Sequence, residues 1–405
     1  MRRSPLWLLA GLALGGAASG CGKAALQPSV QGALPGPSTP PRHGVIALAT
    51  KNTTRLGGAD APTDAASVAL AVYPGLTTAT RPQAVVLVDD RDWPAAVAAA
   101  ALAAAPLGAP LLYAHGDELP AVTAHALRQL RPLGASALGG AQVIRIGTTA
   151  AVPYGYRVST VSVAGGAASA AAAVARLIGM AQGKPQQVIV LSEGAARALQ
   201  MPAAGLAAES GAPILFVGDA AVPAPTAAAL AGLHRPAIYL LGAPGVSSST
   251  LAALGRLGRV SKIVPAEGAQ AGAGADPVDN AVAVSRFSDG SFGWGIREAG
   301  HGLVFLNPAR ALDAPAAAPL SAHGDYGPLL LLADRTSLPP ALARYLSDIQ
   351  PGYTAAIRPV REVYNHGWLI GDESAISALA QAEIDAILEV APRTTSTEPS
   401  PAGPE

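Results

Sequence analysis

The chain has 405 residues, which is too long for one ordinary hydrophobic core and indicates two to four compact units. Half of the residues are hydrophobic and only 13% are charged, with 27 basic residues balancing 27 acidic residues. This balance argues against a protein that binds nucleic acid or anionic membranes through a generally basic surface.

The N-terminal residues have the pattern of an export signal. Arg2 and Arg3 precede an apolar stretch at 6–14, and small residues then lead to Cys21. The apolar stretch is too short to span a bilayer as a helix, which needs about 20 residues. Residues 1–20 are therefore predicted to be a signal peptide. Cys21 is the sole cysteine in the sequence, so an intramolecular disulfide is excluded.

The segment before Cys21 resembles the lipobox of bacterial lipoproteins, although Ala18 stands where that motif usually has leucine. The resemblance implies cleavage before Cys21 and a diacylglycerol on its thiol. An ordinary secretory signal with an incidental cysteine is the alternative. Acyl chains contribute about 0.8 kcal/mol per buried methylene and would hold the protein on the outer surface of the cell membrane. The proline-rich residues 21–43 are predicted to be a tether, and residues 392–405 a disordered tail.

The next residues are predicted to alternate strands and helices. A short leading strand is expected to end at the turn formed by Gly57, and a helix to follow as far as Val72. Apolar runs without polar alternation indicate strands buried on both faces of a parallel sheet, and such runs lie at 85–88, 111–113 and just before Gly147. Pro94 and Pro120 fit the first positions of the helices between them. Together these elements form a βαβαβ unit with right-handed crossovers.

The same order of elements returns twice. The tripeptide at 108–110 has counterparts at 211–213 and 327–328, and Pro120 has counterparts at Pro223 and Pro339. Because two independent anchors keep nearly the same spacing, we interpret the pattern as an internal repeat. The chain is therefore predicted to be an α/β protein with three tandem flavodoxin-like, doubly wound repeats, at 44–158, 159–260 and 261–391.

The third copy has two further features. A helix is expected at 374–390, where apolar residues recur on one face: Ile376, Leu379, Ile384, Ile387 and Leu388. A long insert at 264–302 is rich in glycine and aromatic residues. It is expected to be either a binding loop or a hairpin that packs on the body.

The triplicated unit resembles the cell wall binding repeat 2 family of Gram-positive surface proteins over residues 53–390. The resemblance rests on the repeat itself and on a leading Arg-x-x-Gly-x-Asp element, present here as Arg55, Gly58 and Asp60. It implies a pseudo-threefold arrangement of the repeats. It also implies non-covalent attachment to an anionic cell-wall polymer or a peptidoglycan-associated glycan.

Only part of the opening element of that family is present. Ala61 stands in place of its second arginine, and the third copy keeps Asp276 but has Pro277 at the corresponding position. Lys262 is the nearest cation upstream in the third copy. We take Arg55, Asp60, Lys262 and Asp276 as candidates for contact with the polymer, because guanidinium groups bind anions through paired, charge-assisted hydrogen bonds. The missing arginines leave open a different, weaker or absent ligand.

No catalytic motif is apparent in the sequence. It has no Gly-x-Ser-x-Gly elbow, no phosphate-binding loop and no pair of Cys or His at zinc spacing. The acidic run at 89–92 follows a predicted buried strand, a position where Mg²⁺ binds in related folds, but a solvated turn is the commoner outcome. The sequence thus predicts no enzymatic activity, no cofactor and no metal site.

Three functions remain in view from the sequence. The first is a lipid-anchored, extracytoplasmic protein that binds cell-wall polymer through its three repeats. The second is a lipoprotein solute receptor of a transporter, which requires two lobes and a cleft. The third is an enzyme that uses the acidic run at 89–92. The sequence does not predict an oligomeric state.

Overall fold

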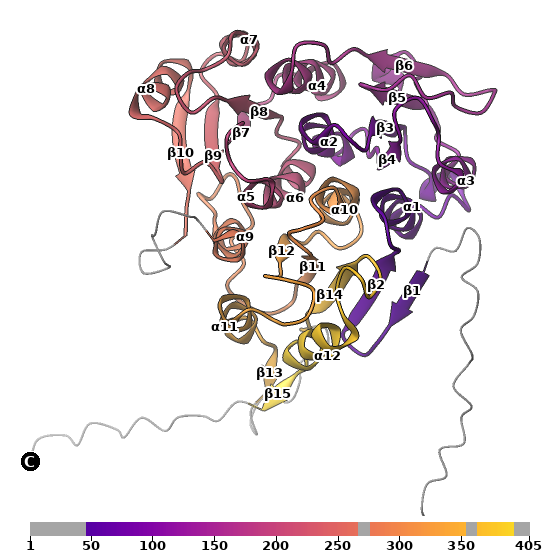
Figure 1. Ribbon diagram of the computed structural model, residues 1–405, viewed down its shortest axis with the longest axis vertical. Coiled ribbons are helices and arrows are strands. Elements are labelled where there is room, and N and C mark those ends of the chain that lie inside the picture. The colour runs from indigo at the N-terminus through magenta and orange to yellow at the C-terminus, as the bar shows by residue number, and fades with distance from the viewer. Residues whose placement is uncertain (1–45, 266–275, 354–362, 393–405) are drawn as a thin grey trace, which may run out of the picture. The chain divides into compact units, whose positions relative to one another are not determined.

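The computed structural model describes residues 46–265, 276–353 and 363–392 (Figure 1). Residues 42–405 group into one compact unit. The predictions for the signal peptide, Cys21, the tether and residues 393–405 of the tail lie outside the described residues. The α/β class is confirmed, because the strands form mainly parallel sheets covered by helices. No helix within the described ranges has the length and apolar character needed to cross a membrane.

The first sheet has four parallel strands in the order β4-β3-β5-β6. The strands are β3 (Val85–Asp89), β4 (Leu111–Ala114), β5 (Val143–Ile146) and β6 (Val158–Val161). Its helical elements are α2 (Trp93–Ala99), η2 (Ala100–Ala103), α3 (Ala121–Leu130) and η3 (Ser136–Leu138). Asp92 caps α2 by accepting a hydrogen bond from the Ala95 amide, and Pro94 lies in its first turn. The local signals in the sequence therefore set where this helix begins.

The second sheet repeats this order as β8-β7-β9-β10, again with all strands parallel. The strands are β7 (Gln187–Ser192), β8 (Ile214–Val217), β9 (Ala237–Leu241) and β10 (Arg259–Ile263). The helices are α5 (Arg197–Gln200), α6 (Pro202–Ser210), α7 (Ala224–Ala231) and α8 (Ser248–Leu257). The strands β7 and β8 are almost entirely buried, which explains their uninterrupted apolar sequences.

The third sheet combines strands from the two ends of the described chain, in the order β1-β2-β14-β11-β12. Only β1 is antiparallel to its neighbour. The strands are β1 (Ile46–Ala49), β2 (Thr53–Gly57), β11 (Gly302–Leu306), β12 (Leu329–Leu331) and β14 (His366–Ile370). The helices are α10 (Asp313–Ala322), α11 (Pro340–Asp348) and α12 (Ala378–Ile387). Smaller elements are η1 (Thr78–Thr80) and the pair β13 (Gly352–Tyr353) and β15 (Ala391–Pro392).

The leading strand of each sequence repeat pairs with the sheet of the preceding repeat. β6 pairs with β5, and β10 pairs with β9. β2 has no preceding repeat and instead pairs with β14, more than 300 residues later in the chain. The expected segment 44–158 thus supplies a strand to the last sheet, so both ends of the described chain are needed to complete it.

Three helices lie between neighbouring sheets, and each follows a leading strand. They are α1 (Ala61–Val72), α4 (Ala167–Gln182) and α9 (Pro277–Arg286). Each packs on the second strand of its own repeat, β4, β8 or β12. The helices α4 and α9 also pack on a helix of the preceding repeat, α2 or α6, whereas α1 packs on α10 of the third repeat. Near the centre of the view in Figure 1, α10 lies beside α6, and both helices contact η2. Their buried alanines, such as Ala103, Ala204 and Ala317, allow the helices to approach closely.

Two expectations for the third repeat need correction. The helix expected at 374–390 begins only at Ala378, because Ser377 caps it and the preceding residues form a turn around Asp372. Leu379 is 64% exposed and does not belong to the buried face. In the insert, 277–286 form α9 and Phe292 stacks on Tyr239 with 4.0 Å between ring centroids. The described part of the insert therefore packs on the body, on β12 of the third sheet through α9 and on β9 of the second sheet through Phe292, with a helix in place of a hairpin.

Candidate functional site

An open cavity of about 710 Å³ lies at the carboxyl ends of β2, β11 and β14. We call it the junction cavity. Its walls come from the loop before α1, from α5, from the loop between β11 and α10, and from the loop after β14. The lining residues are Ala59, Asp60, Ala61, Arg197, Ala198, Ser374 and the six residues at 308–313. Segments of all three expected repeats thus meet in this cavity.

The wall of the junction cavity contains a cluster of three charged residues, Arg310, Asp64 and Asp313, which we call the Arg310 cluster. The Arg310 guanidinium donates to Asp64 Oδ2, and its Nε lies 2.9 Å from Asp313 Oδ2. It also donates to the carbonyl oxygens of Gly58 and Ala59 at 3.3–3.4 Å. The Arg310 side chain is 17% exposed, whereas those of Asp64 and Asp313 are 0% and 1% exposed. Arg310 therefore separates the two carboxyl groups from solvent.

The two carboxyl groups of the Arg310 cluster share a proton near neutral pH. Burial raises the pKa of Asp64 to about 9 and that of Asp313 to about 6, although Arg310 opposes both shifts. The carboxyl groups also hydrogen-bond to each other. Asp313 Oδ1 is buried and has no hydrogen-bond partner among the described residues. One proton and one guanidinium offset the two carboxyl groups, so the cluster carries almost no net charge.

Arg55, a candidate for polymer contact, lies inside the fold. It is 3% exposed. Its Nε and Nη2 donate to Gln381 Oε1 at 3.1 and 2.8 Å, and its Nη1 donates to the Gly371 carbonyl at 3.0 Å. Burial lowers the pKa of Arg55, while the nearby Glu373 and Asp372 raise it. Arg55 thus fixes β2 to α12 and to the loop after β14, in place of the expected surface contact.

Asp60 and Asp276 occupy equivalent places at the starts of α1 and α9. Asp60 Oδ1 accepts a hydrogen bond from the Thr63 amide at 2.8 Å. Asp276 Oδ1 accepts from the amides of Val278 and Asp279 at 2.7 and 3.2 Å. N-capping is therefore a sufficient reason for both aspartates. Asp60 also lines the junction cavity.

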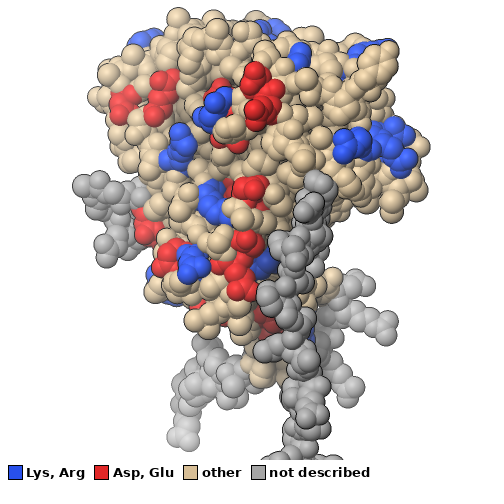
Figure 2. All heavy atoms as spheres, turned by 45° about the vertical axis from the view of Figure 1, so that its right-hand side comes forward, with Lys and Arg blue, Asp and Glu red and all other residues tan. Residues whose placement is uncertain are grey.

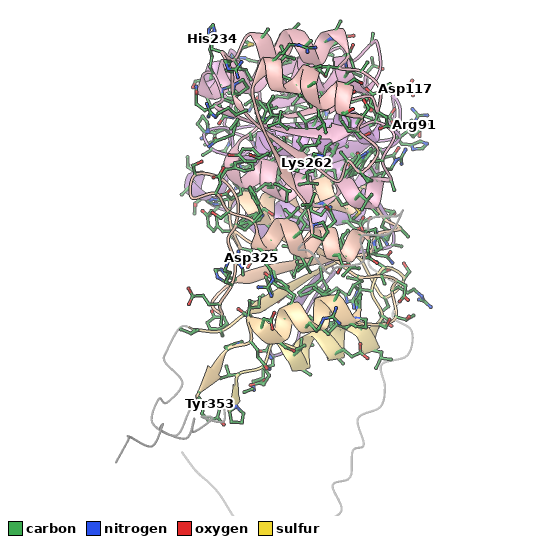
Figure 3. All side chains as sticks on the ribbon, turned by 90° about the vertical axis from the view of Figure 1, so that its left-hand side faces the viewer. Arg91, Asp117, His234, Lys262, Asp325 and Tyr353 are labelled. Carbon is green, nitrogen blue, oxygen red and sulfur yellow. The ribbon has the colours of Figure 1, made fainter. Side chains whose placement is uncertain are left out.

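Lys262 and Arg55 occupy the same register position in two different sheets. Arg55 pairs with Leu369, and Lys262 pairs with Leu240. Each of these two leucines lies two residues before a glycine, Gly371 or Gly242, that ends an apolar run. Lys262 is exposed on the edge strand β10 (Figure 3) and lines a separate cavity of about 260 Å³ together with Asn280. The structure thus places Asp60 and Lys262 in two different cavities and does not bring the four candidates into one site.

No sequence motif identifies Arg197 or the Arg310 cluster as possible polymer contacts. Arg197 begins α5, is exposed, and makes no side-chain hydrogen bond or ion pair with another described residue. A local signal existed for Arg310 and Asp313, which are three positions apart just after a buried strand. Asp64, a charge inside an alanine-rich helix, was a second signal. Nothing local showed that Asp64 and Arg310 meet.

The acidic run at 89–92 is occupied by contacts within the protein. Asp89 pairs with Arg91 at 2.8 Å, and the hydrogen bonds from Arg91 lower the pKa of Asp89 to about 2. Asp90 lies 3.0 Å from His115 Nδ1, and Asp92 caps α2. Arg91 and Asp117 lie at the same edge of the molecule (Figure 3). Among the described residues, no group of three or more His, Cys, Asp or Glu is placed to hold a metal ion.

The surface charges are sparse and mixed in sign. Figure 2 shows one face on which small groups of basic and acidic side chains lie next to each other, separated by wide uncharged areas. The described residues on that face provide no continuous basic track for a polyanion. An anionic ligand would therefore depend on single cations such as Arg197.

Comparison with known proteins places the fold but not a family. No family model matches the sequence, and no match was found among curated proteins. Two similar solved structures are Cwp6 from Clostridium difficile, with a TM-score of 0.64, 17% identity and 85% of this chain covered, and Cwp8 from the same organism, with 0.61, 18% and 84%. The match covers 51% and 52% of those chains, so this chain spans about half their length. At such identities the likeness establishes a shared fold alone.

Proposed function

We propose that this is a cell-surface protein that binds a cell-wall polymer non-covalently in the junction cavity. The similar structures are those of cell wall proteins, which supports a cell-wall-associated role. As part of the proposal, Cys21 carries a lipid anchor that holds the protein on the outer surface of the cell membrane. The proposal also includes that the three sheets are copies of one flavodoxin-like unit in a pseudo-threefold arrangement. The shared strand order of the sheets supports the last point.

The observation that carries this proposal is that segments of all three expected repeats line one cavity. A polymer in the junction cavity would contact residues 59–61, 197–198 and 308–313 at once. The Asp60 carboxylate and the Ser374 hydroxyl offer hydrogen-bond partners for sugar hydroxyl groups. Because the Arg310 cluster is almost neutral, Arg197 is the cation available to an anionic group of the polymer.

Binding without catalysis fits the carboxyl groups at this site. A pair of carboxyl groups that shares a proton also occurs in acid–base enzymes. A catalytic acid must lie within hydrogen-bonding reach of its substrate. Asp64 is fully buried behind Arg310, and the side chain of Asp313, which borders the cavity, is only 1% exposed, which argues against a catalytic role for either. The carboxylates at 89–92 are engaged with Arg91, His115 and the start of α2.

The solute-receptor alternative requires two lobes that close on a ligand. The described residues instead form three large sheets within one compact unit, joined by α1, α4 and α9. We therefore place the proposed ligand class among cell-wall polymers, either an anionic polymer or a peptidoglycan-associated glycan.

Co-sedimentation of the full-length chain with purified cell wall, before and after extraction of the anionic polymer, tests this proposal. We expect binding to the wall, and Arg197→Gln to weaken it about tenfold or more, because a charged hydrogen bond contributes about 1.5–3 kcal/mol. Arg128→Gln is the matched control, since Arg128 is also exposed but lies outside the junction cavity. Absence of binding to either preparation, or equal losses in both variants, would contradict the proposed site.

A further inference from the structure

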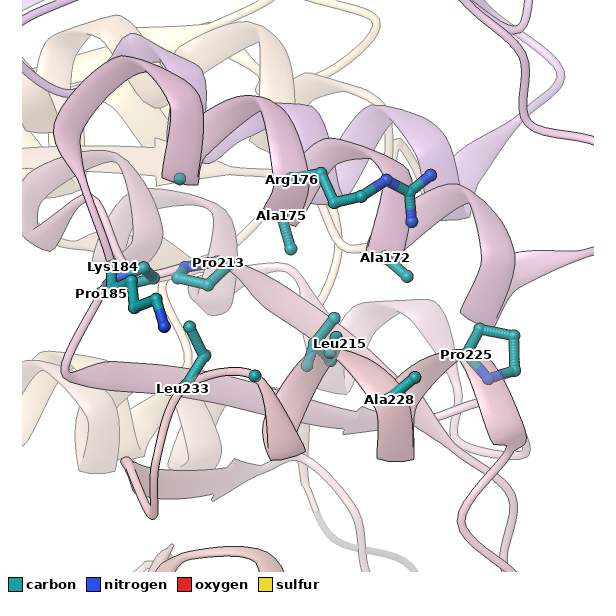
Figure 4. A pocket seen from close by; sticks show the side chains of 13 residues that line it. Ala172, Ala175, Arg176, Lys184, Pro185, Pro213, Leu215, Pro225, Ala228 and Leu233 are labelled. Carbon is teal, nitrogen blue, oxygen red and sulfur yellow. The ribbon is translucent and has the colours of Figure 1, made fainter.

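A second cavity of about 360 Å³ lies between α4 and α7, over β8 (Figure 4). We call it the α4–α7 cavity. Its walls are mainly apolar and include Ala172, Ala175, Leu215, Ala229 and Leu233. The volume is within the range of small-molecule sites, which are typically about 300–1,000 Å³. It is distinct from the junction cavity, with which it shares no lining residue.

In the third sheet, a tyrosine fills the equivalent space between α9 and α11. Tyr345 is the sixth residue of α11, as Ala229 is of α7. Ser285 is the ninth residue of α9, as Ala175 is of α4. Tyr345 is 1% exposed, and its hydroxyl shares a 2.5 Å hydrogen bond with the Ser285 hydroxyl. The second sheet thus has two alanines where the third has an aromatic ring and its hydrogen-bond partner.

The cation that covers this ring is present in both places. Arg286, the tenth residue of α9, lies over the Tyr345 ring with its Cζ 4.9 Å from the centroid. Arg176 is the tenth residue of α4 and lines the α4–α7 cavity. Its side chain makes no hydrogen bond or ion pair with another described residue, and it is exposed. The second sheet therefore keeps the arginine of a cation–π pair but not the ring.

A second cation lies toward the other end of the cavity. Figure 4 shows Lys184 near Leu233, whereas the Arg176 guanidinium lies toward the end formed by Pro225. Lys184 Nζ is 3.1 Å from His234 Nε2 and has no carboxylate partner among the described residues. None of the residues that line the cavity is acidic. The charges around this apolar space therefore favour an anionic group.

The opening is not a general feature of the repeat. Ala69 and Ala126 are the counterparts of Ala175 and Ala229 in α1 and α3, and both are fully buried. Ala175 and Ala229 are both partly exposed. The space is thus accessible from solvent at α4 and α7.

From this comparison we propose that the α4–α7 cavity binds a small molecule made of one aromatic ring and an anionic substituent, the class of the aromatic carboxylates. The ring takes the place that Tyr345 occupies in the third sheet, next to Arg176. The carboxylate lies toward Lys184. The ring supplies the apolar area and the π face, and the carboxylate supplies the charge.

Calorimetric titration of the full-length chain with 4-hydroxyphenylacetate tests the proposal. Two comparison ligands separate its parts: 4-hydroxyphenethylamine has the same ring with a positive charge, and cyclohexylacetate has the same charge without a π face. We expect saturable binding of the aromatic acid and at least about tenfold weaker binding of both comparison ligands. No saturation at millimolar concentration, or equally tight binding of the amine, would overturn the proposal.

Variants locate the site. Ala229→Tyr fills the cavity as in the third sheet and should abolish binding, whereas Ala231→Tyr, on the exposed end of α7, should leave it unchanged. Arg176→Gln and Lys184→Gln leave the cavity open and should each weaken binding at least about fivefold. Unchanged affinity in a folded Ala229→Tyr variant would overturn the proposed location. If that variant does not fold, unchanged affinity in Arg176→Gln would do the same.

Discussion

Arg310 donates a hydrogen bond to Asp64, a residue 246 positions earlier in the chain. The contact joins the loop after β11 to the helix that follows β2. The pairing of β2 with β14 joins the same two parts of the chain. Asp64 and Asp313 are both buried, and Arg310 is their only cationic partner in the described structure. The Arg310 cluster therefore stabilises the junction at which the described chain closes on itself.

Replacement of Arg310 should strongly destabilise the protein. Arg310→Met leaves two buried carboxyl groups without their cation, and loss of one partner of a buried ion pair costs about 3–5 kcal/mol. The free energy of unfolding, measured by chemical denaturation, should fall by that amount. Arg197→Met is the matched control, because Arg197 lines the same cavity without a partner. Its effect should stay within about 0.5 kcal/mol, and equal losses in the two variants would contradict the role of the cluster.

The proton shared by Asp64 and Asp313 should make the protein less stable as the pH rises. The folded state keeps this proton up to a pKa of about 9, whereas the unfolded state releases it near the ordinary pKa of an aspartate, 3.8. The folded state thus binds more protons than the unfolded state, so the free energy of unfolding falls with pH by up to about 1.4 kcal/mol per unit. This contribution is complete below pH 4 and is lost as the pH approaches 9.

Between pH 7 and 9, the change in the free energy of unfolding with pH reports mainly on Asp64. Asp325 (Figure 3), whose pKa burial raises to about 7, and Asp313 act in the same direction mainly at lower pH. Asp313→Asn supplies an amide N–H that can donate to the Asp64 carboxylate in place of the shared proton. Denaturation at several pH values should therefore show a smaller slope in this variant than in the parent protein. A flat profile from pH 7 to 9 in the parent protein would contradict the shared proton.

Arg55 should be needed for stability and not for contact with a polymer. Arg55→Met leaves Gln381 Oε1 and the Gly371 carbonyl without their buried donors, which should lower the free energy of unfolding by about 1–3 kcal/mol or more. Wall co-sedimentation of the variant, at a temperature where it remains folded, should match the parent protein. Reduced wall binding by a fully folded Arg55→Met variant would restore Arg55 as a polymer contact.

Local signals in the sequence predicted the strands and helices of each unit. The run at 85–88 is β3, and Pro94 and Pro120 lie at the starts of α2 and α3, because apolar runs and proline act through neighbouring residues. The pairing of β2 with β14 could not be predicted in this way. The sequence of β2 is typical of a strand that begins a repeat, and that of β14 is typical of a strand that ends one. Neither sequence indicates which sheet has a free edge that can accept β2.

The candidate site was only partly predictable for the same reason. Asp60 was identified from its motif and does line the junction cavity, and Lys262 lines the equivalent end of another sheet. Arg55 matched the motif equally well but is buried, because Gln381 of α12 covers it from the far end of the chain. Arg197 has no motif, and its place at the cavity depends on how the second sheet packs against the third. Tertiary packing thus decided which charges reach the surface.

The tyrosine that fills the third sheet should contribute mainly through its ring. Tyr345→Ala removes a fully buried aromatic side chain and leaves a cavity between α9 and α11, which should cost about 3–5 kcal/mol. Tyr345→Phe removes only the hydrogen bond with Ser285 and should cost about 0.5–1.5 kcal/mol. Chemical denaturation of both variants measures the difference. Similar losses in the two variants would mean that the hydroxyl dominates, and the equivalent space at α4 and α7 would then lose its interpretation as a place for an aromatic ring.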